Sequence, residues 1–217
     1  MELDLIVFIK CSGPNVREDN LTDTIVSFAK KNVNCKYGFY ITVDPHMESV
    51  VQNIFKNQEY KSFLDPSSLL DLKVSQKSWA IDFNNFFDEY QDKTKWILIS
   101  HDDVEYITDD YFNKIMESIK GHEDKVGWIT STSNYYYEQE GKIVTDTFRA
   151  GSYEDFDNWG AMFQLHRMGH LKNTSPAIIQ QSLHLLDFPT APVKVHGIMS
   201  AIMLVSVDSL KKIGYCE

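Results

Sequence analysis

The chain has 217 residues, of which 43% are hydrophobic and 24% are charged, and its formal net charge is −10. This size and composition are typical of one sizeable globular domain. The negative charge argues against unaided binding of nucleic acid, which needs a basic surface. No apolar run reaches the roughly 18–20 residues that span a bilayer, and the first one is too short for a signal peptide. We therefore expect a cytoplasmic protein with no transmembrane segment and no nucleic-acid partner.

The pattern of apolar residues in the first 60 positions predicts alternating strands and helices. Residues 3–10 form a continuous apolar run rich in β-branched residues, which is typical of a buried strand in a parallel sheet. A helical face follows at 21–29, with Asn20 as the expected N-cap. A second strand over 37–44 and a helix over 47–57 complete a β-α-β-α order. This order indicates an α/β domain.

Weaker but similar signals continue along the rest of the chain. The further elements that we expect are a short strand near 70–74, a helix over 79–91, a strand over 96–100, a helix over 109–121 capped by Thr108 or Asp109, a strand over 126–132, a hairpin over 134–148, and a strand followed by a helix over 201–214. Together they predict a single domain with a Rossmann-like mixed, mainly parallel sheet flanked by helices. We expect residues 1–132 to form a nucleotide-sugar-binding half and 133–217 a more variable, acceptor-side half.

An acidic cluster ends the strand predicted over 96–100. His101, Asp102 and Asp103 follow it directly, and ligands bind at the carboxyl ends of strands in open α/β sheets. Adjacent carboxylates repel each other unless a cation offsets the charge, and hard oxygen ligands favour Mg²⁺ or Mn²⁺. The alternative is an acidic loop that caps the next helix. The cluster alone does not decide between these two hypotheses.

Five features stand in a particular order around this cluster. The first strand and its loop, "VFIKCSGPNVREDNLTDTIVSF", carry Arg17, Leu21 and Ser27, and the second strand, "YITVD", ends at Asp44. Asn85 lies 16 residues before His101, in the helix before the acidic strand. The acidic strand and its helix follow as "WILISHDDVEYITDDYFNKI", and the last feature is "HGIMSAIMLVSVDSLKKIGYCE", with Gly197, Gly214 and Glu217.

In this order and spacing the chain resembles the family 2-like glycosyltransferases of GT-A fold over most of its length. It departs from the family pattern where Lys10 and Cys11 replace a Pro-Thr pair, and where His101 replaces the first acid of the DXD motif. The resemblance implies a GT-A-like fold, a nucleoside diphosphate sugar as donor, a glycan or other hydroxyl acceptor, and Mn²⁺ or Mg²⁺ as cofactor. Motif matches of this kind are hypotheses that a structure has to test.

The resemblance also implies roles for individual residues. The positions implied to bind the nucleotide sugar are Lys10, Cys11, Ser12, Arg17, Asp44, Asn85 and Asp102. Asp103 is implied to bind the metal, and His101 either binds it through a neutral nitrogen or only hydrogen-bonds nearby. Asp44 is implied to contact the base, and the alternative for it is a turn residue at a strand end. Arg17 either approaches the diphosphate or is an ordinary surface arginine.

The general base that would deprotonate the acceptor is the least defined residue. In the family it lies shortly after the segment that begins near Glu217, where this chain stops. The chain is therefore either the N-terminal piece of a longer protein or takes its base from elsewhere. Asp155 and Asp157 in "SYEDFDNWG" are our candidates, with Glu154 and Asp187 as further possibilities.

Two other functions compete with a metal-dependent glycosyltransferase. A module that binds a nucleotide sugar but lacks the base would keep the same fold, because fold does not imply activity. A sugar nucleotidyltransferase would hold a triphosphate in a loop rich in glycine and basic residues after the first strand. That loop, "CSGPNVRED", contains one glycine and one basic residue, which disfavours the nucleotidyltransferase.

Overall fold

A computed structural model describes residues 3–13, 16–129, 133–139, 142–148 and 202–214. Contacts divide the chain into two compact units, one made of Met1–Ile129 with Ser200–Glu217 and the other of Thr130–Met199. In the second unit, the described residues form the two antiparallel strands β6 (Ser133–Gln139) and β7 (Lys142–Phe148). This pair confirms the hairpin predicted over 134–148.

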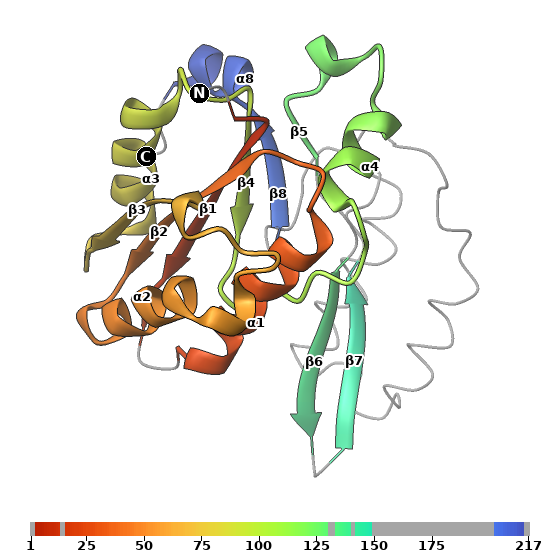
Figure 1. Cartoon of the computed structure of the whole chain (residues 1–217). Helices are drawn as coiled ribbons and strands as arrows, with labels where there is room; N and C mark the ends of the chain where they lie inside the picture. Colours follow the sequence, from red (N-terminus) through yellow and green to blue (C-terminus); the bar gives the residue numbers. More distant parts are fainter. Residues whose placement is uncertain (1–2, 14–15, 130–132, 140–141, 149–201, 215–217) are drawn as a thin grey trace, which may run out of the picture. The chain divides into compact units, whose positions relative to one another are not determined.

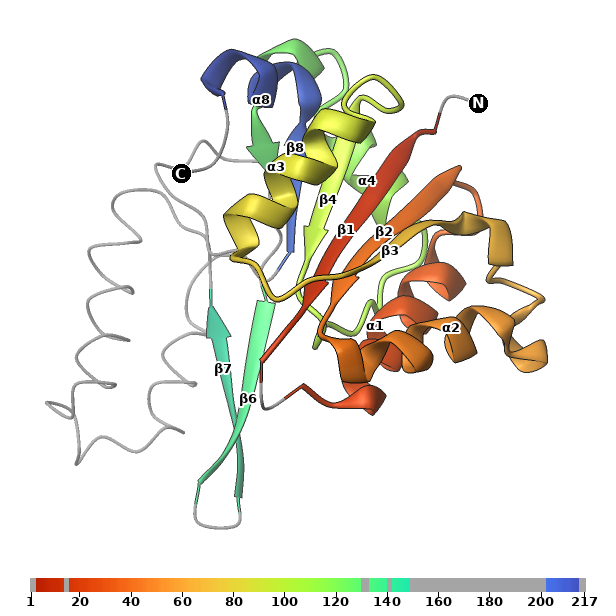
Figure 2. The ribbon, with the colours of Figure 1, turned by 90° about the vertical axis from the view of Figure 1, so that its left-hand side faces the viewer.

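The first unit is built on a six-stranded sheet (Figures 1 and 2). Its strands, in spatial order, are β3 (Leu69–Val74), β2 (Tyr37–Val43), β1 (Leu5–Cys11), β4 (Trp96–Ser100), β8 (Ile202–Ser206) and β5 (Trp128–Ile129). The first four run parallel, whereas β8 is antiparallel to both of its neighbours. The predicted α/β class, with a mixed and mainly parallel sheet flanked by helices, is therefore confirmed.

Helices cover both faces of this sheet (Figure 2). The helices on one face are α1 (Glu18–Lys31), α2 (Glu48–Lys56) and α4 (Tyr111–Ser118), and those on the other are α3 (Trp79–Tyr90) and α8 (Val207–Ile213). Single 3-10 turns occur at Pro45–Met47, Gln58–Tyr60, Pro66–Ser68 and Glu123–Lys125. Among the described helices, none is both long and apolar enough to cross a bilayer.

Alternation along β1 assigns its side chains to two separate cores. Leu5, Val7 and Ile9 belong to the core under α1, α2 and α4, and Ile6 and Phe8 belong to the core under α3 and α8. All five side chains are fully buried, because successive residues of a strand point to opposite faces and both faces are covered here. The continuous apolar run in the sequence therefore reflects burial on both sides.

The structure corrects two predicted helix starts. Helix α1 begins at Glu18, so Asn20 lies inside it, and Arg17 takes the N-cap position without a side-chain capping bond. Helix α4 begins at Tyr111, after Asp110 in a left-handed conformation with φ 53°. The Asp110 carboxylate accepts a hydrogen bond from Asn34 at 2.9 Å, and Asp109 pairs with Lys31 at 2.7 Å. Both acids therefore bond to another part of the chain instead of capping α4.

The far end of the chain returns to the first unit. Strand β8 pairs with β4 over five residues, from Trp96↔Ser206 to Ser100↔Ile202, and α8 packs on the α3 face of the sheet. Residues 202–213 thus complete the sheet of the first unit, although the sequence places them in the second half. The division into donor and acceptor halves stays a prediction.

Candidate functional site

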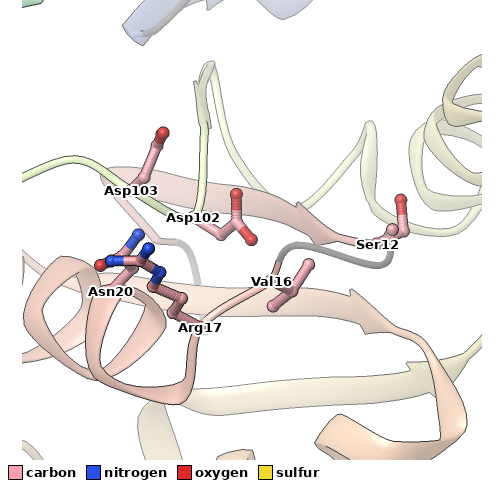
Figure 3. Close-up of a pocket in the computed structure, with 7 residues that line it drawn as sticks. Ser12, Val16, Arg17, Asn20, Asp102 and Asp103 are labelled. Carbon is pink, nitrogen blue, oxygen red and sulfur yellow. The ribbon is translucent and has the colours of Figure 1, made fainter. Parts of the chain in front are cut away.

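The strand order reverses between β1 and β4. From β1 the chain moves outward through β2 to β3, and it then crosses by α3 on the opposite face to return at β4, beside β1. In open α/β sheets, ligands bind at the carboxyl ends of the strands at such a switch point. A pocket of about 260 Å³ lies there (Figure 3). Its lining residues follow β1 or β4: Ser12, Gly13, Val16, Arg17, Asn20, Asp102 and Asp103.

The pocket carries opposite charges on two walls. Arg17 and Asn20, one helical turn apart at the start of α1, place their polar ends together, beside the segment that carries Asp102 and Asp103 (Figure 3). Among the described residues, the five ion pairs involve none of these three charged side chains. A guanidinium that is not paired within the protein can bind a phosphate, and two adjacent carboxylates can share a divalent cation.

The loop that carries Ser12 is held by Asp44. Gly13 has φ +116°, a conformation that favours glycine, and its N–H donates to Asp44 Oδ2 at 2.9 Å. The Asp44 N–H in turn donates to the carbonyl of Cys11 at 3.2 Å. The Asp44 side chain therefore supports the β1–α1 loop. A contact between Asp44 and a nucleotide base stays a prediction.

Cys11 lies close to Asp102. Its side chain is fully buried on the α1 face of the sheet, near enough to the Asp102 carboxylate for the two groups to interact electrostatically. Burial, and then the negative charges of Asp102 and Asp44, raise the pKa of the Cys11 thiol above its ordinary value of 9.0. The thiol thus stays protonated at neutral pH. Because Cys11 is fully buried, it does not line the pocket itself.

Lys10 lies on the other side of the sheet. Its ammonium pairs with Asp82 of α3 at 2.5 Å, and the exposed fractions of the two side chains are only 6% and 4%. Ser75 Oγ donates to the other Asp82 oxygen at 2.7 Å. Strand alternation points Lys10 away from Cys11 and toward α3, so Lys10 does not line the pocket. Its contact with the nucleotide stays a prediction.

Two other predicted site residues do not line the pocket. Asn85 is exposed on α3, the helix that covers the opposite face. His101 is exposed beside the pocket, and its carbonyl accepts a hydrogen bond from Ser100 Oγ at 3.0 Å. The remaining predicted positions lie outside the described residues: Glu154, Asp155, Asp157, Asp187, Gly197 and Glu217.

Sequence reasoning missed two residues near the strand ends. Asn20 lines the pocket, although we expected it to cap a helix. Asp82 lies on the buried side of α3, in the same helical stripe as Phe83 and Phe86. A carboxylate within an apolar stripe needs a buried partner. This sequence pattern could therefore have indicated that Asp82 is buried and paired.

The carboxylate oxygens of the pocket fit a divalent metal only if a bound substrate supplies further metal ligands. Across the described part of the chain, no group of three or more His, Cys, Asp or Glu side chains could hold a metal ion. Asp102 and Asp103 supply hard oxygen donors on one wall. Mg²⁺ commonly binds to one or two carboxylates and takes its other ligands from water and substrate phosphates. The two aspartates fit that kind of site.

Comparisons with known proteins assign no family to the chain. No family model matches it, and no curated protein is a significant relative. One similar solved structure is the crystal structure of 4-diphosphocytidyl-2C-methyl-D-erythritol synthase from Anaerococcus prevotii. It matches with a TM-score of 0.44 and 7% identity, over 68% of each chain. This similarity is too low to indicate a function, and the resemblance to family 2-like glycosyltransferases stays a prediction.

Proposed function

We propose that the pocket between the ends of β1 and β4 binds a nucleoside diphosphate sugar with Mn²⁺ or Mg²⁺, and that the chain is a glycosyltransferase. The acceptor is a glycan or another hydroxyl compound. The observation that carries this proposal is the position of the pocket at the switch point, with Arg17 and the Asp102–Asp103 pair on its walls.

Each pocket residue has a distinct part in this proposal. Asp103, assisted by Asp102, would hold the metal, whose other ligands would come from water and the donor phosphates. Arg17 contacts the diphosphate, to which a guanidinium can donate two parallel hydrogen bonds. Ser12 of the pocket lining, and Asp44, which holds its loop, are assigned to the nucleoside side of the donor. When bound, the metal neutralises the charge that develops on the departing nucleoside diphosphate.

The acceptor hydroxyl needs a base that removes its proton. We propose Asp155 or Asp157 for this role, on the sequence pattern alone. Replacing each by Asn tests the role, because loss of the base lowers turnover while donor binding persists.

Calorimetry with UDP-, GDP- and dTDP-sugars, with and without Mn²⁺, tests the donor site. We expect one class of donor to bind only with the metal. We expect Asp103→Asn to weaken this binding at least about tenfold, or ~1.4 kcal/mol. Asp23→Asn is the matched control, because Asp23 is an exposed acid of α1 outside the pocket lining. No binding of any donor, or equal binding by both variants, would contradict the proposal.

Turnover assays then separate the three functions. Transfer or slow hydrolysis of the bound donor supports the glycosyltransferase. Donor binding without turnover identifies a binding module instead. Formation of a nucleotide sugar from a nucleoside triphosphate and a sugar phosphate, with release of pyrophosphate, identifies a nucleotidyltransferase.

A further inference from the structure

The acidic pair lies in a segment without secondary structure of its own. Between the end of β4 and the start of α4, residues 101–110 form neither helix nor strand. Backbone N–H groups in such a segment need partners from elsewhere in the fold. The partners fix where Asp102 and Asp103 stand.

Side chains of α1 supply these partners. The Val104 N–H donates to Thr24 Oγ1 at 2.9 Å, and the Tyr106 N–H donates to Ser27 Oγ at 2.9 Å. Thr24 is only 1% exposed. The bond to Thr24 is one residue beyond Asp103, so it acts directly at the acidic pair.

Further bonds attach the remainder of the segment to the same helix. The Asp110 N–H donates to the carbonyl of Lys31 at 2.6 Å, and the Phe112 N–H donates to the buried Asn32 Oδ1 at 3.0 Å. The segment therefore runs along α1 from Thr24 to its C-terminal end. Asn32, the C-cap residue of α1, acts at the far end, because it bonds to Phe112 in the first turn of α4, nine residues beyond Asp103 in sequence.

Tyr106 links the segment to the end of β4 by a hydrogen bond. Its buried hydroxyl donates to Ser100 Oγ at 2.9 Å, and Ser100 Oγ donates to the carbonyl of His101 at 3.0 Å. Burial raises the pKa of the Tyr106 phenol, which keeps its proton and remains a donor. The turn that holds Asp102 and Asp103 is thus attached on one side to β4 and on the other to α1.

Helix α1 therefore provides both the pocket wall opposite Asp102 and Asp103 and the hydroxyl groups that hold the segment carrying these two residues. Arg17, Asn20, Thr24 and Ser27 are spaced three or four residues apart, so they follow one face of α1. We propose that Thr24 and Ser27 are positioning residues that hold the Asp102–Asp103 pair in register with Arg17. This inference rests on the proposed function of the pocket.

The test compares three variants of the whole chain. Thr24→Val has nearly the same shape but removes the hydroxyl that accepts from Val104, and Thr24→Ser keeps a hydroxyl. Asn32→Ala removes a buried bond to Phe112 at the start of α4, far from the acidic pair. The probe is Mn²⁺ with UDP, GDP or dTDP, whichever nucleoside diphosphate the donor experiment selects.

We expect Thr24→Val to weaken binding of the metal–nucleotide probe roughly 10–100-fold, as is common when a residue that orients metal ligands is lost. We expect Thr24→Ser to bind within about twofold of the wild type. Asn32→Ala should lower the midpoint of urea unfolding and leave affinity nearly unchanged. Amide exchange of Val104 should accelerate in Thr24→Val and not in Thr24→Ser.

Three results would overturn the inference. They are unchanged binding by Thr24→Val, unchanged exchange of Val104 in that variant, and equal losses of affinity in Thr24→Val and Asn32→Ala. Failure of the wild type to bind any donor is a different result. It removes the proposed function and, with it, the ligand that these residues would position.

Discussion

Charged side chains at the same strand ends have different surroundings on the two faces of the sheet. On the α3 face, Lys10 and Asp82 are buried against each other and Ser75 completes the cluster. On the α1 face, Arg17, Asp102 and Asp103 stand around a pocket and form no ion pair within the described chain. The charges of the first group are paired and hydrogen-bonded within the protein, whereas those of the second are accessible to a ligand.

This difference separates charges that maintain the fold from charges available for function. A buried pair whose members satisfy each other has little left to offer a ligand, and removing one member leaves a buried charge. Groups that line an open pocket can be replaced at small cost in stability. Stability and binding measurements on the two faces should therefore give opposite results.

The largest expected effect is on the α3 face. Asp82→Ala leaves the Lys10 ammonium buried and unpaired, and we expect it to lower the free energy of unfolding by about 3–5 kcal/mol. Urea denaturation followed by circular dichroism measures this loss. The double variant Lys10→Met with Asp82→Leu should recover most of it, because apolar groups of similar volume can replace a buried ion pair.

The same double variant tests whether the comparison of faces is correct. If Lys10 only maintains the fold, the double variant binds the metal–nucleotide probe about as well as the wild type. A loss of binding in a stable double variant would place Lys10 in the site, as the family resemblance first implied.

A smaller effect is expected at Asp44, which bonds to Gly13 of the pocket lining. Asp44→Ala removes the acceptor of the Gly13 N–H, and we expect it to lower the free energy of unfolding by about 1.5–3 kcal/mol, the usual value for a hydrogen bond to a charged group. Asp44→Asn keeps an acceptor oxygen and should retain most of this stability. Thermal or urea unfolding measures both variants.

Binding by Asp44→Asn then sharpens the role of this residue. Normal stability with weaker donor binding would assign Asp44 a contact with the ligand as well as with the loop. Normal stability and normal binding would limit Asp44 to loop support. An Asp44→Ala variant as stable as the wild type would contradict the contribution of the Gly13 bond.

The smallest effect is a loss of stability in mild alkali. Burial raises the pKa of Cys35 to about 12 and that of Cys11 above 9.0. Unfolded thiols lose their protons near pH 9, so above that pH the folded chain binds more protons than the unfolded chain, and stability falls as pH rises. We expect a loss of about 1 kcal/mol per buried thiol between pH 7.5 and 9.5.

Urea unfolding at the two pH values measures this slope, with Cys11→Ala as the comparison. Removing the Cys11 thiol should reduce the slope, whatever the variant does to stability at pH 7.5. An unchanged slope would show that Cys11 ionises as easily in the folded chain as in the unfolded one.

Local patterns in the sequence were enough for most of the fold. Apolar runs bounded by turn residues predicted the strands at 37–44 and 96–100 within one residue of β2 and β4, and helical spacing predicted α3 at 79–91. The same patterns put Arg17 and the Asp102–Asp103 pair directly after strands. Because parallel strands end at a common edge, their meeting at one pocket was predictable.

Only the tertiary structure decided which charged groups meet. Lys10 and Cys11 are adjacent in sequence, yet the helix packed on each face makes one a buried ion-pair member and the other a buried thiol near Asp102. Likewise, Thr24 reaches Val104 across 80 positions, and Asp109 and Asp110 bond to α1 and its adjoining loop rather than capping α4. Strand and helix periods are local properties of the chain, whereas these contacts depend on how distant elements pack, which no short stretch of sequence encodes.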